Sequence, residues 1–369
     1  MTVRVGLIGT SWWADFMYLS PLKEHRHCTV VAVCGRNAEN SQKLADKWGV
    51  PLVFTDYNAL IDSGEVDALM VVTPNVSHYP ITMKALGAGL HVLCEKPLAM
   101  NYQQAREMAE LAEQKGVKTF VPFTWSFMPY ARYLKELIAN GYLGKPYHCN
   151  LRYYSGYSRD NASQYVWRMD VAQAGSGALG DLGSHFTHLA YWLFGDITSV
   201  CSHLGQIGEH APLDPSGQAY ELADDTAVLT LTFDNGAQGS VHVTTLAYAG
   251  ASPIGTTFHM DFHGSDGTLS GLSDFETRQH ISGAKPGEPI HDLPIPDSIW
   301  AGANRDSVME TIGDVYGKQE FMAREWVTAI AEDKPLRPDF REGAAIQRVI
   351  DAAIKSHQER RWVDIEEIQ

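Results

Sequence analysis

The sequence predicts an α/β protein whose first third forms a doubly wound parallel sheet. Two observations lead to this fold class. Short runs of β-branched and apolar residues alternate with helical stretches as far as residue 122, and a glycine-containing turn directly follows the first run. Strands that are separated by helices need crossover connections, and such connections place the strands parallel in one sheet.

Five runs are expected to be strands buried on both faces, because their apolar residues are consecutive rather than alternating. These runs are Val3–Ile8, Thr29–Val33, Ala68–Val72, Leu90–Cys94 and Thr119–Val121. Apolar residues at helical spacing predict the helices between them. The predicted helices are Glu39–Trp48, Ser77–Ala88 and Asn101–Lys115.

The turn after the first strand is the candidate dinucleotide-binding loop. It consists of Gly9, Thr10, Ser11, Trp12, Trp13 and Ala14. A dinucleotide fingerprint reads G-x-G-x-x-G/A, so the first glycine and the final small residue are present and Ser11 replaces the middle glycine. A serine still lets the backbone N–H groups at the helix start face a pyrophosphate, and its hydroxyl can donate as well.

The choice between NAD and NADP depends on the end of the second strand. An acidic residue there would bind the ribose 2′-hydroxyl, whereas an arginine would bind a 2′-phosphate. The chain has Cys34-Gly35-Arg36-Asn37 and no carboxylate before Glu39. Arg36 can stack on the adenine or bind a phosphate, and the alternative is a solvated arginine that opens a helix. We expect NADP, with NAD as the alternative.

The tripeptide Glu95-Lys96-Pro97 follows the predicted strand Leu90–Cys94. Proline disfavours the α region for the residue before it, so Lys96 should be extended. Its ammonium then projects from the carboxyl end of a buried strand, where open α/β sheets bind ligands. Desolvating a lysine is costly, so we expect its charge to be used there. The alternative is a surface lysine in a strand-to-helix loop.

The segment Thr73-Pro74-Asn75 closes the strand Ala68–Val72 and is followed by His78. Asn75 is a suitable cap for the helix that begins near Ser77, and a cofactor contact is compatible with that role. His78 is interpreted as a helix-start residue and candidate cofactor contact rather than as a catalytic histidine.

A glycine-rich segment, Gly175–Gly195, leads into a helix that Gly195 should end. Asp181 and His185 are four residues apart, so they would share one helix face, with Asp181 in the first turn. A carboxylate can bring the pKa of a neighbouring imidazole close to neutral pH, as a proton-transfer group requires. The alternative for His185, and our interpretation of His188, is a half-buried helix histidine. No third ligand accompanies them, so a metal pair is not expected.

Length and charge favour a two-domain protein with a small-molecule ligand. The chain has 369 residues, more than the roughly 250–300 at which one core stops growing. We place the boundary so that residues 1–124 form the first domain and residues 125–369 the second. A formal charge of −15 argues against nucleic acid as a partner, because phosphate binding needs a basic face.

The cysteines and the N-terminus indicate the cytoplasm. The five cysteines are scattered without a Cys-x-x-Cys pair, which fits a reducing compartment and makes a metal site unexpected. The strand that starts at Val3 leaves no room for a signal peptide. No apolar run approaches the ~18 residues that span a bilayer, so no membrane partner is expected.

Three motifs, in their sequential context, resemble those of the Gfo/Idh/MocA oxidoreductases, the relatives of glucose–fructose oxidoreductase and inositol dehydrogenase. The motifs are Glu95-Lys96-Pro97, Thr73-Pro74-Asn75 and Asp181-x-Gly183-x-His185. The resemblance covers essentially the whole chain. It includes a closing helix at Lys318–Glu332, a turn at 334–338 and a final helix at Ala344–His357.

The resemblance implies an N-terminal Rossmann domain and a C-terminal α+β domain with a large, mostly antiparallel open sheet. The C-terminal helices can pack back on the Rossmann domain. Two hairpin signals agree with the second sheet. They are Ala227–Phe233 with Gln238–Leu246, and Thr256–Phe262 with Thr268–Leu272. In the family a partner subunit often covers such a sheet, so a homodimer or homotetramer is expected.

The resemblance also implies roles for particular residues. Lys96 resembles the family's catalytic lysine, and Asp181 and His185 resemble its acidic and histidine partners. Trp167-Arg168 resembles a pair beside the nicotinamide and the substrate. Two positions depart from the family pattern: Ser11 stands where many members have glycine, and Thr124-Trp125-Ser126-Phe127 replaces a segment with asparagine and arginine. The second departure leaves the substrate open.

The implied activity is hydride transfer between NAD(P) and a secondary hydroxyl or ketone of a sugar, polyol or related carbohydrate. His185 would exchange the hydroxyl proton, Lys96 would stabilise charge on the substrate oxygen without a metal, and Asp181 would orient both. The candidate cofactor contacts are Gly9, Thr10, Ser11, Trp12, Trp13, Ala14, Arg36, Thr73, Pro74, Asn75, His78, Glu95, Lys96, Trp167 and Arg168. The candidate substrate contacts are Lys96, Tyr154, Tyr157, Arg168 and His185.

Two other functions stay open. A regulator could bind a dinucleotide without catalysis, although it would have no need of the lysine, aspartate and histidine. A glycosidase with a bound cofactor would hydrolyse its substrate with no net change in nicotinamide absorbance. The loops Gly205–Leu222 and Ser282–Pro296 either set specificity or only cover the sheet.

Overall fold

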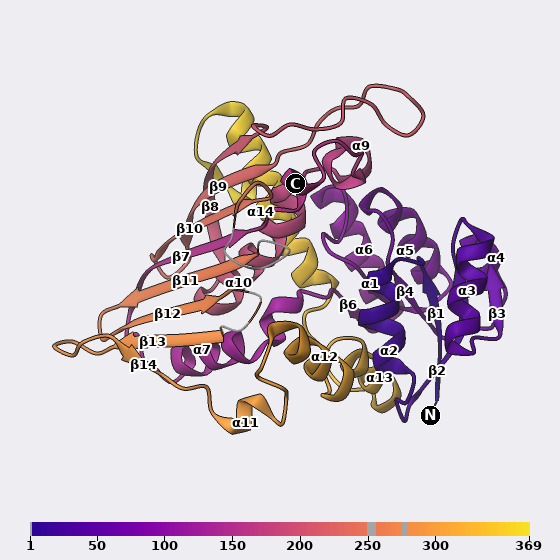
Figure 1. Cartoon of the computed structure of the whole chain (residues 1–369), viewed down its shortest axis with the longest axis horizontal. Helices are drawn as coiled ribbons and strands as arrows, with labels where there is room; N and C mark the ends of the chain where they lie inside the picture. Colours follow the sequence, from indigo (N-terminus) through magenta and orange to yellow (C-terminus); the bar gives the residue numbers. More distant parts are fainter. Residues whose placement is uncertain (1, 249–255, 275, 277–278) are drawn as a thin grey trace. The chain divides into compact units, whose positions relative to one another are not determined.

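The computed structural model describes residues 2–248, 256–274, 276 and 279–369, and the described residues form two compact units (Figure 1). The first unit combines Met1–Pro122 with Gly313–Ala345, and the second combines Phe123–Ile312 with Ile346–Gln369. Residues 313–345 therefore group with the opening part of the chain, whereas a single boundary at residue 124 assigns them to the second domain.

The sheet of the first unit is parallel throughout. Among the described residues its six strands have the order β3-β2-β1-β4-β5-β6, the order found in Rossmann folds. The strands are β1 (Val3–Ile8), β2 (Cys28–Cys34), β3 (Leu52–Phe54), β4 (Ala68–Val71), β5 (His91–Cys94) and β6 (Thr119–Phe120). The five predicted strands are confirmed. Strand β3 was not predicted, because it is too short to show a recognisable pattern in the sequence.

The predicted helices of the first unit are also confirmed. They are α3 (Ala38–Trp48), α5 (His78–Gly87) and α6 (Tyr102–Lys115), to which the structure adds α4 (Tyr57–Asp62). The side chains of Asn37 and Asn101 cap α3 and α6 by accepting backbone N–H groups. The connection after β1 is irregular, because a π-helical turn interrupts it. It consists of α1 (Trp12–Ala14), the π turn η1 (Asp15–Leu19) and α2 (Ser20–Leu22).

Three helices fall in or across the segment 313–345. They are α12 (Val308–Lys318), α13 (Ala323–Glu332) and α14 (Phe340–Glu359). The prediction of one helix over Lys318–Glu332 is wrong, because the chain breaks between α12 and α13, where Met322 has a φ of 56°. The predicted final helix is confirmed and extends beyond Ala344–His357 at both ends.

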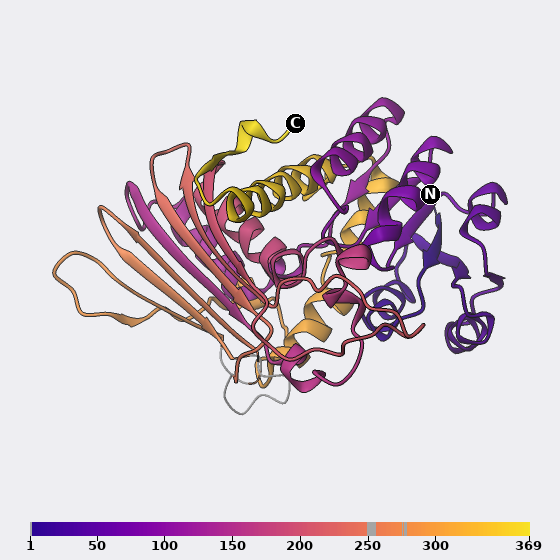
Figure 2. The same cartoon turned by 90° about the horizontal axis from the view of Figure 1, so that it is seen from above.

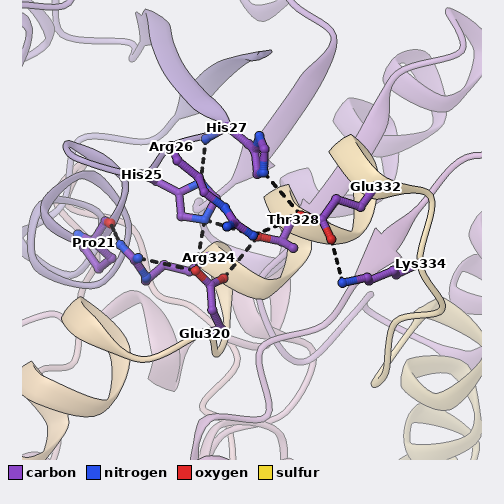
Figure 3. A network of polar contacts seen from close by, with 9 residues as sticks. All are labelled: Pro21, His25, Arg26, His27, Glu320, Arg324, Thr328, Glu332 and Lys334. Carbon is purple, nitrogen blue, oxygen red and sulfur yellow. Dashed lines mark hydrogen bonds and ion pairs between the residues drawn. The ribbon is translucent and has the colours of Figure 1, made fainter. Parts of the chain in front are cut away.

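A polar network joins α13 and the residues next to it to α2 and the segment between α2 and β2 (Figure 3). Arg324 donates to the backbone oxygen of Pro21 at 2.8 Å, across 303 positions of sequence. The buried His25 lies 3.4 Å from Glu320, and burial lowers the pKa of this histidine. Figure 3 also shows Glu332 paired with Arg26, His27 and Lys334. These contacts explain why residues 313–345 group with the first unit.

The second unit is built on a large mixed sheet. In the part of the chain that the structure describes, nine strands have the order β14-β13-β12-β11-β7-β10-β9-β8-β15. Only the β7–β10 pair is parallel among these described strands, so the sheet is mostly antiparallel as expected. The strands are β7 (Pro146–Tyr154), β8 (Ile197–Gly205), β9 (Thr226–Phe233), β10 (Gln238–Thr244), β11 (Thr257–Gly264), β12 (Thr268–Ser273), β13 (Gln279–Ala284), β14 (His291–Asp292) and β15 (Val363–Asp364). Both predicted hairpins, β9–β10 and β11–β12, are confirmed.

The two faces of this sheet differ. Inward side chains such as Cys149, Leu151 and Tyr153 on β7 are buried, and helices α7 (Pro129–Ala139) and α10 (Ser184–Phe194) pack on that face. Side chains on the opposite face are mostly polar and at least partly exposed. Shorter elements complete the unit: η3 (Thr124–Phe127), α8 (Tyr157–Asp160), η4 (Trp167–Met169), α9 (Val171–Ala174), the π turn η5 (Leu179–Gly183), α11 (Asp297–Trp300) and η6 (Ile365–Glu367). Figure 2 shows the strands running side by side in this sheet.

Among the described residues, no helix has the length and the hydrophobicity that a membrane crossing requires.

Candidate active site

The turn after β1 has the geometry of a phosphate-binding loop. Gly9 has a φ of 119°, and a Cβ there would lie 1.9 Å from the backbone oxygen of Val72, so only glycine fits. Ser11 caps the helix that follows, because its Oγ accepts the N–H of Ala14 at 3.2 Å. A hydroxyl that accepts still has its own hydrogen to donate, as the sequence interpretation requires. Trp12 is exposed beside this turn.

The loop after β5 presents Lys96. Lys96 is half-buried, and Glu95 before it is buried. One carboxylate oxygen of Glu95 accepts the backbone N–H of Lys96 at 3.1 Å, and the other accepts the indole N–H of Trp13 at 2.7 Å. The hydroxyl of Tyr18 donates to that second oxygen as well. The strand ends of β1 and β5 are therefore connected through one carboxylate.

The loop after β4 differs from its predicted role. Asn75 is buried in the 3₁₀ turn η2 (Asn75–Ser77), and no side-chain cap bonds to the start of α5. The interpretation of Asn75 as a helix cap is therefore wrong, because the 3₁₀ turn continues into α5 and leaves no free position for a cap. Thr73 and Pro74 precede this turn as predicted.

His78 is a helix-start histidine, as the sequence indicates. It is fully buried, and its two ring nitrogens lie 3.0 Å from the backbone oxygen of Pro97 and 2.9 Å from that of Thr73. Burial lowers its pKa, and the two carbonyl contacts act in the opposite direction. His78 therefore joins the loop after β4 to the loop that carries Lys96.

Arg36 lies exposed in the connection from β2 to α3. The next residue, Asn37, caps α3 through a 2.9 Å bond from the N–H of Asn40. Gly35 packs closely on Thr10, since a Cβ at position 35 would lie 2.7 Å from the Thr10 methyl group. The end of β2 thus contacts the glycine loop, and the Arg36 side chain extends from that end.

In the second unit, a buried carboxylate holds the segment that carries Asp181. Asp224 accepts the N–H groups of Gly177 and Leu179 at 2.8 and 2.7 Å. Burial raises the pKa of Asp224 to about 6, against the lowering effect of these two bonds. The segment then forms the π turn η5, which includes Asp181, and α10 begins only at Ser184. The expectation of one continuous α-helical face for Asp181 and His185 is corrected, because a π turn changes the angular spacing.

Asp181 forms an ion pair with Arg168, whose Nε lies 3.3 Å from Oδ2. The Arg168 guanidinium also lies over the indole ring of Trp167, 4.5 Å from its centroid. Tyr157 belongs to the same group, since burial and the charge of Asp181 raise its pKa while Arg168 lowers it. The structure thus brings together four predicted site residues of the second unit: Tyr157, Trp167, Arg168 and Asp181.

His185 and His188 lie on α10 among aromatic rings. His185 is 6% exposed and lies 5.8 Å from Trp125 between ring centroids. His188 is buried and stacks on Phe123 at 4.1 Å, which agrees with its interpretation as a helix histidine. Trp125 belongs to the segment that departs from the family pattern, so that departure lies beside His185.

Tyr154 is not brought together with this group. It follows Tyr153 on β7, so the two side chains point to opposite faces of the sheet. The Tyr154 hydroxyl lies 2.7 Å from Nδ1 of His242 on the neighbouring strand β10. The structure therefore does not group this predicted substrate contact with Tyr157, Trp167, Arg168 and Asp181.

Two functional positions were missed in the sequence. Tyr18 gives no helical-period signal, because a π turn separates it from Trp13. Asp224 stands in the acidic pair Asp224-Asp225 directly before β9, and buried acidic residues at a strand start are a signal that could have found it.

Comparison with known proteins agrees with this organisation. Residues 3–123 match the family described as "Oxidoreductase family, NAD-binding Rossmann fold" (GFO_IDH_MocA). Residues 135–365 match its counterpart, "Oxidoreductase family, C-terminal alpha/beta domain".

Individual relatives share this arrangement. The levoglucosan dehydrogenase of Pseudarthrobacter phenanthrenivorans is 28% identical over 90% of this chain and 88% of its own length. The D-glucoside 3-dehydrogenase of Escherichia coli is 32% identical over 63% of this chain and 68% of its own. The structure of an oxidoreductase domain protein from Kribbella flavida superposes with a TM-score of 0.82 at 29% identity, covering 99% of this chain and 100% of that one. A levoglucosan dehydrogenase in complex with NADH and L-sorbose, at 24% identity, has the same fold with a TM-score of 0.87 and full coverage of both chains, 100% each.

Proposed function

The chain belongs to the Gfo/Idh/MocA family of oxidoreductases, and on that premise we propose that it transfers a hydride between nicotinamide and a secondary hydroxyl or ketone of a sugar or polyol. The levoglucosan and D-glucoside dehydrogenases among its relatives support a carbohydrate substrate. One observation carries the proposal: the same chain has Lys96 at the carboxyl end of β5 and the Arg168–Asp181 pair with His185 at the start of α10.

The reaction divides between cofactor and protein. When bound, the nicotinamide supplies the hydride chemistry, and the chain supplies position and electrostatic field. In oxidation His185 takes the proton of the substrate hydroxyl, and Lys96 donates to the same oxygen as negative charge develops on it. Asp181 fixes the Arg168 guanidinium, and Tyr157 and Trp167 offer a hydroxyl and an aromatic face to the sugar ring.

The test is turnover of a panel of sugars and polyols with NAD and with NADP, followed by nicotinamide absorbance. Lys96→Ala and His185→Ala are each expected to lower kcat by about 10²–10⁴-fold, the usual contribution of a proton-transfer or charge-stabilising group. Lys43→Ala removes an exposed lysine that pairs with Glu39 and should keep full turnover. Wild-type turnover in Lys96→Ala would refute the assignment.

For the cofactor we propose NADP in preference to NAD. The support is the exposed Arg36 at the end of β2, where residues 35–37 offer no carboxylate for a ribose 2′-hydroxyl. Arg36→Ala should raise the KM for NADP about tenfold, as loss of a charge-assisted phosphate bond would, and leave the KM for NAD nearly unchanged. Equal effects on both cofactors would contradict a 2′-phosphate contact.

We also propose that the protein is a cytoplasmic homodimer or homotetramer formed through the second sheet. The face opposite α7 and α10 supports this, because it exposes the apolar side chain of Val228 to 40%. Light scattering of the purified chain measures the mass directly. Val228→Glu on this face should lower the mass to that of a monomer of 40.8 kDa, and a wild-type protein of that mass would refute the proposal.

A further inference from the structure

The buried carboxylate of Glu95 bonds to two loops that the proposed function uses for different tasks. Its Oε1 accepts the indole N–H of Trp13 at 2.7 Å and also the hydroxyl of Tyr18. Its Oε2 accepts the backbone N–H of Lys96 at 3.1 Å. Trp13 and Tyr18 belong to the helix that starts at the dinucleotide loop, whereas Lys96 belongs to the loop after β5. One side chain therefore spans both.

The π turn η1 makes this arrangement possible. Trp13 and Tyr18 are five positions apart, and in an α-helix only residues three or four apart share a face. A π-helical turn is closed by bonds between residues five apart, so such residues come to the same side. With η1 at Asp15–Leu19, the Trp13 indole and the Tyr18 hydroxyl reach the same oxygen of Glu95.

The turn is held on its other side as well. Asp15, the first residue of η1, accepts the indole N–H of Trp48 and the ammonium of Lys47, both at 2.6 Å. These two residues end α3. Because both sides of η1 are bonded, its position is defined by α3 on one side and by Glu95 on the other.

Burial makes the bonds to Glu95 strong. Glu95 is 8% exposed and Tyr18 is fully buried. Hydrogen bonds to an ionised group in a site without water are shorter and stronger than those between neutral groups. If a buried acceptor loses its donor, no hydrogen bond compensates the free-energy cost of its desolvation. Burial and the neighbouring Glu95 raise the pKa of Tyr18 well above its ordinary value, so the phenol keeps its proton and stays a donor.

We propose that Tyr18 and Glu95 are positioning residues that lock the dinucleotide loop and Lys96 into one arrangement. The inference rests on the proposed function for the roles of that loop and of Lys96. It goes beyond that function because it assigns a task to Tyr18, a fully buried residue, and because both oxygens of Glu95 accept hydrogen bonds from within the protein.

The test compares two tyrosine-to-phenylalanine variants that each remove one hydroxyl. Tyr18→Phe removes the bond to Glu95, and the matched control Tyr79→Phe removes a tyrosine–glutamate bond of the same kind, to Glu107, between α5 and α6. Tyr18→Phe should weaken binding of the reduced dinucleotide and lower kcat, each by about tenfold, the effect of losing one hydrogen bond to a charged group. Tyr79→Phe should change neither by more than about twofold, because its hydroxyl is part-exposed.

Amide hydrogen exchange gives a readout that needs no turnover. In the protein without ligands, Tyr18→Phe should speed exchange both in residues 9–14 and in residues 92–98, because Glu95 couples them, and Tyr79→Phe should speed it in neither. If the exchange result holds but the wild type converts no sugar, the coupling stands and the proposed function fails.

The proposal is overturned if Tyr18→Phe matches Tyr79→Phe in dinucleotide affinity and kcat while the wild type is active. It is also overturned if exchange rises only in residues 9–14. Should Tyr18→Phe not fold, Trp13→Phe removes the other donor to the same oxygen. Because Trp13 is itself a candidate cofactor contact, only the exchange outcomes apply to this variant.

Discussion

A methyl group at position 9 would lie 1.9 Å from the backbone oxygen of Val72, in a residue whose φ is 119°. Gly64 also has a positive φ, 71°, but has nothing within 4 Å of a built Cβ. Alanine substitutions at Gly64 and Gly9 therefore separate the cost of backbone strain from the cost of steric overlap. Gly64→Ala should lower the free energy of unfolding by about 1–2 kcal/mol, the cost of the left-handed region. Gly9→Ala should lower it by more than about 3 kcal/mol and abolish dinucleotide binding, since the loop must move.

Thermal or denaturant unfolding and a dinucleotide titration measure both glycine variants. If Gly9→Ala costs no more than Gly64→Ala, the close approach of the β1 turn to β4 does not constrain this position.

Asp224 illustrates how one buried carboxylate can make stability depend on pH. Burial raises its pKa to about 6 in the folded protein, whereas in the unfolded chain an aspartate titrates near its ordinary value of about 3.9. Between these two values the folded state binds a proton that the unfolded state does not. Asp224 therefore contributes stability that increases as pH falls from about 6 towards 4, opposite in sign to a salt-bridged carboxylate.

Asp224→Asn should remove this dependence. The free energy of unfolding of the wild type minus that of the variant should grow by about 2 kcal/mol between pH 7 and pH 4.5, as the shift in pKa requires. At pH 7 the variant should also lose kcat, because an NH2 group, which cannot accept, replaces one of the two oxygens that accept from Gly177 and Leu179 and so hold the segment with Asp181. Denaturant titrations at several pH values make the measurement. A difference that stays constant with pH would contradict the raised pKa.

At the scale of elements, both units place a π turn where a candidate catalytic group is held. The turn η1 brings Trp13 and Tyr18 to Glu95, and the turn η5 contains Asp181. A π turn has rare geometry and often occurs at functional sites, because it re-aims side chains that an α-helix would place elsewhere. In each unit, an irregular segment thus lies at predicted site residues of that unit.

Asp181→Asn tests the η5 arrangement, since it keeps the shape of the side chain and removes its charge. Arg168 then loses its ionic partner, and kcat should fall about 10–100-fold with a smaller change in KM for the dinucleotide. Asp160→Asn is the matched control, because Asp160 pairs with Arg159 at the surface of the same unit at 2.6 Å. An exposed pair contributes about 0–1 kcal/mol, so this variant should stay active. Equal kcat in both variants would remove Asp181 from the site.

The regular elements could be predicted from the sequence because their signals are local. Consecutive apolar residues and helical spacing gave the parallel strands and the three long helices, and the runs Ala227–Phe233 and Gln238–Leu246 gave the β9–β10 hairpin. The Asn75 cap and the continuous Lys318–Glu332 helix were wrong, because composition alone does not distinguish a 3₁₀ turn or a break at a positive φ from a regular helix.

Many residues of the candidate site could be predicted from the sequence, but the contacts between them could not. Lys96, Asp181 and His185 were found from their motifs, and the Arg168–Asp181 pair and the link from Glu95 to Tyr18 depend on contacts between distant segments. Such contacts leave no periodic trace in a single sequence. Tyr154 shows the converse, since simple alternation along β7 would have assigned it to the other face.

At the scale of the whole molecule, each unit has a sheet of its own, and both units are discontinuous in sequence. Helix α13 packs on α2, β1 and β5, and Arg324 connects it to Pro21. Arg324→Ala should lower the free energy of unfolding by about 1–3 kcal/mol, because the arginine is largely buried and its removal leaves the backbone oxygen of Pro21 without this donor and takes one donor from Glu320.

Arg305→Ala is the control for Arg324→Ala. Arg305 pairs with Asp297 while both side chains are at least half exposed, so its loss should cost less than about 1 kcal/mol. Denaturant unfolding of the full chain compares the two. Similar values would mean that the network of Figure 3 adds little to the first unit.

The return of residues 313–345 to the first unit has a consequence for synthesis on the ribosome. The six parallel strands of the described residues have been translated by residue 120, yet the helix that packs on β1 and β5 is translated only some two hundred residues later. During that interval the nascent sheet carries an uncovered apolar flank, so a gene fragment that stops at residue 122 should yield an aggregation-prone product.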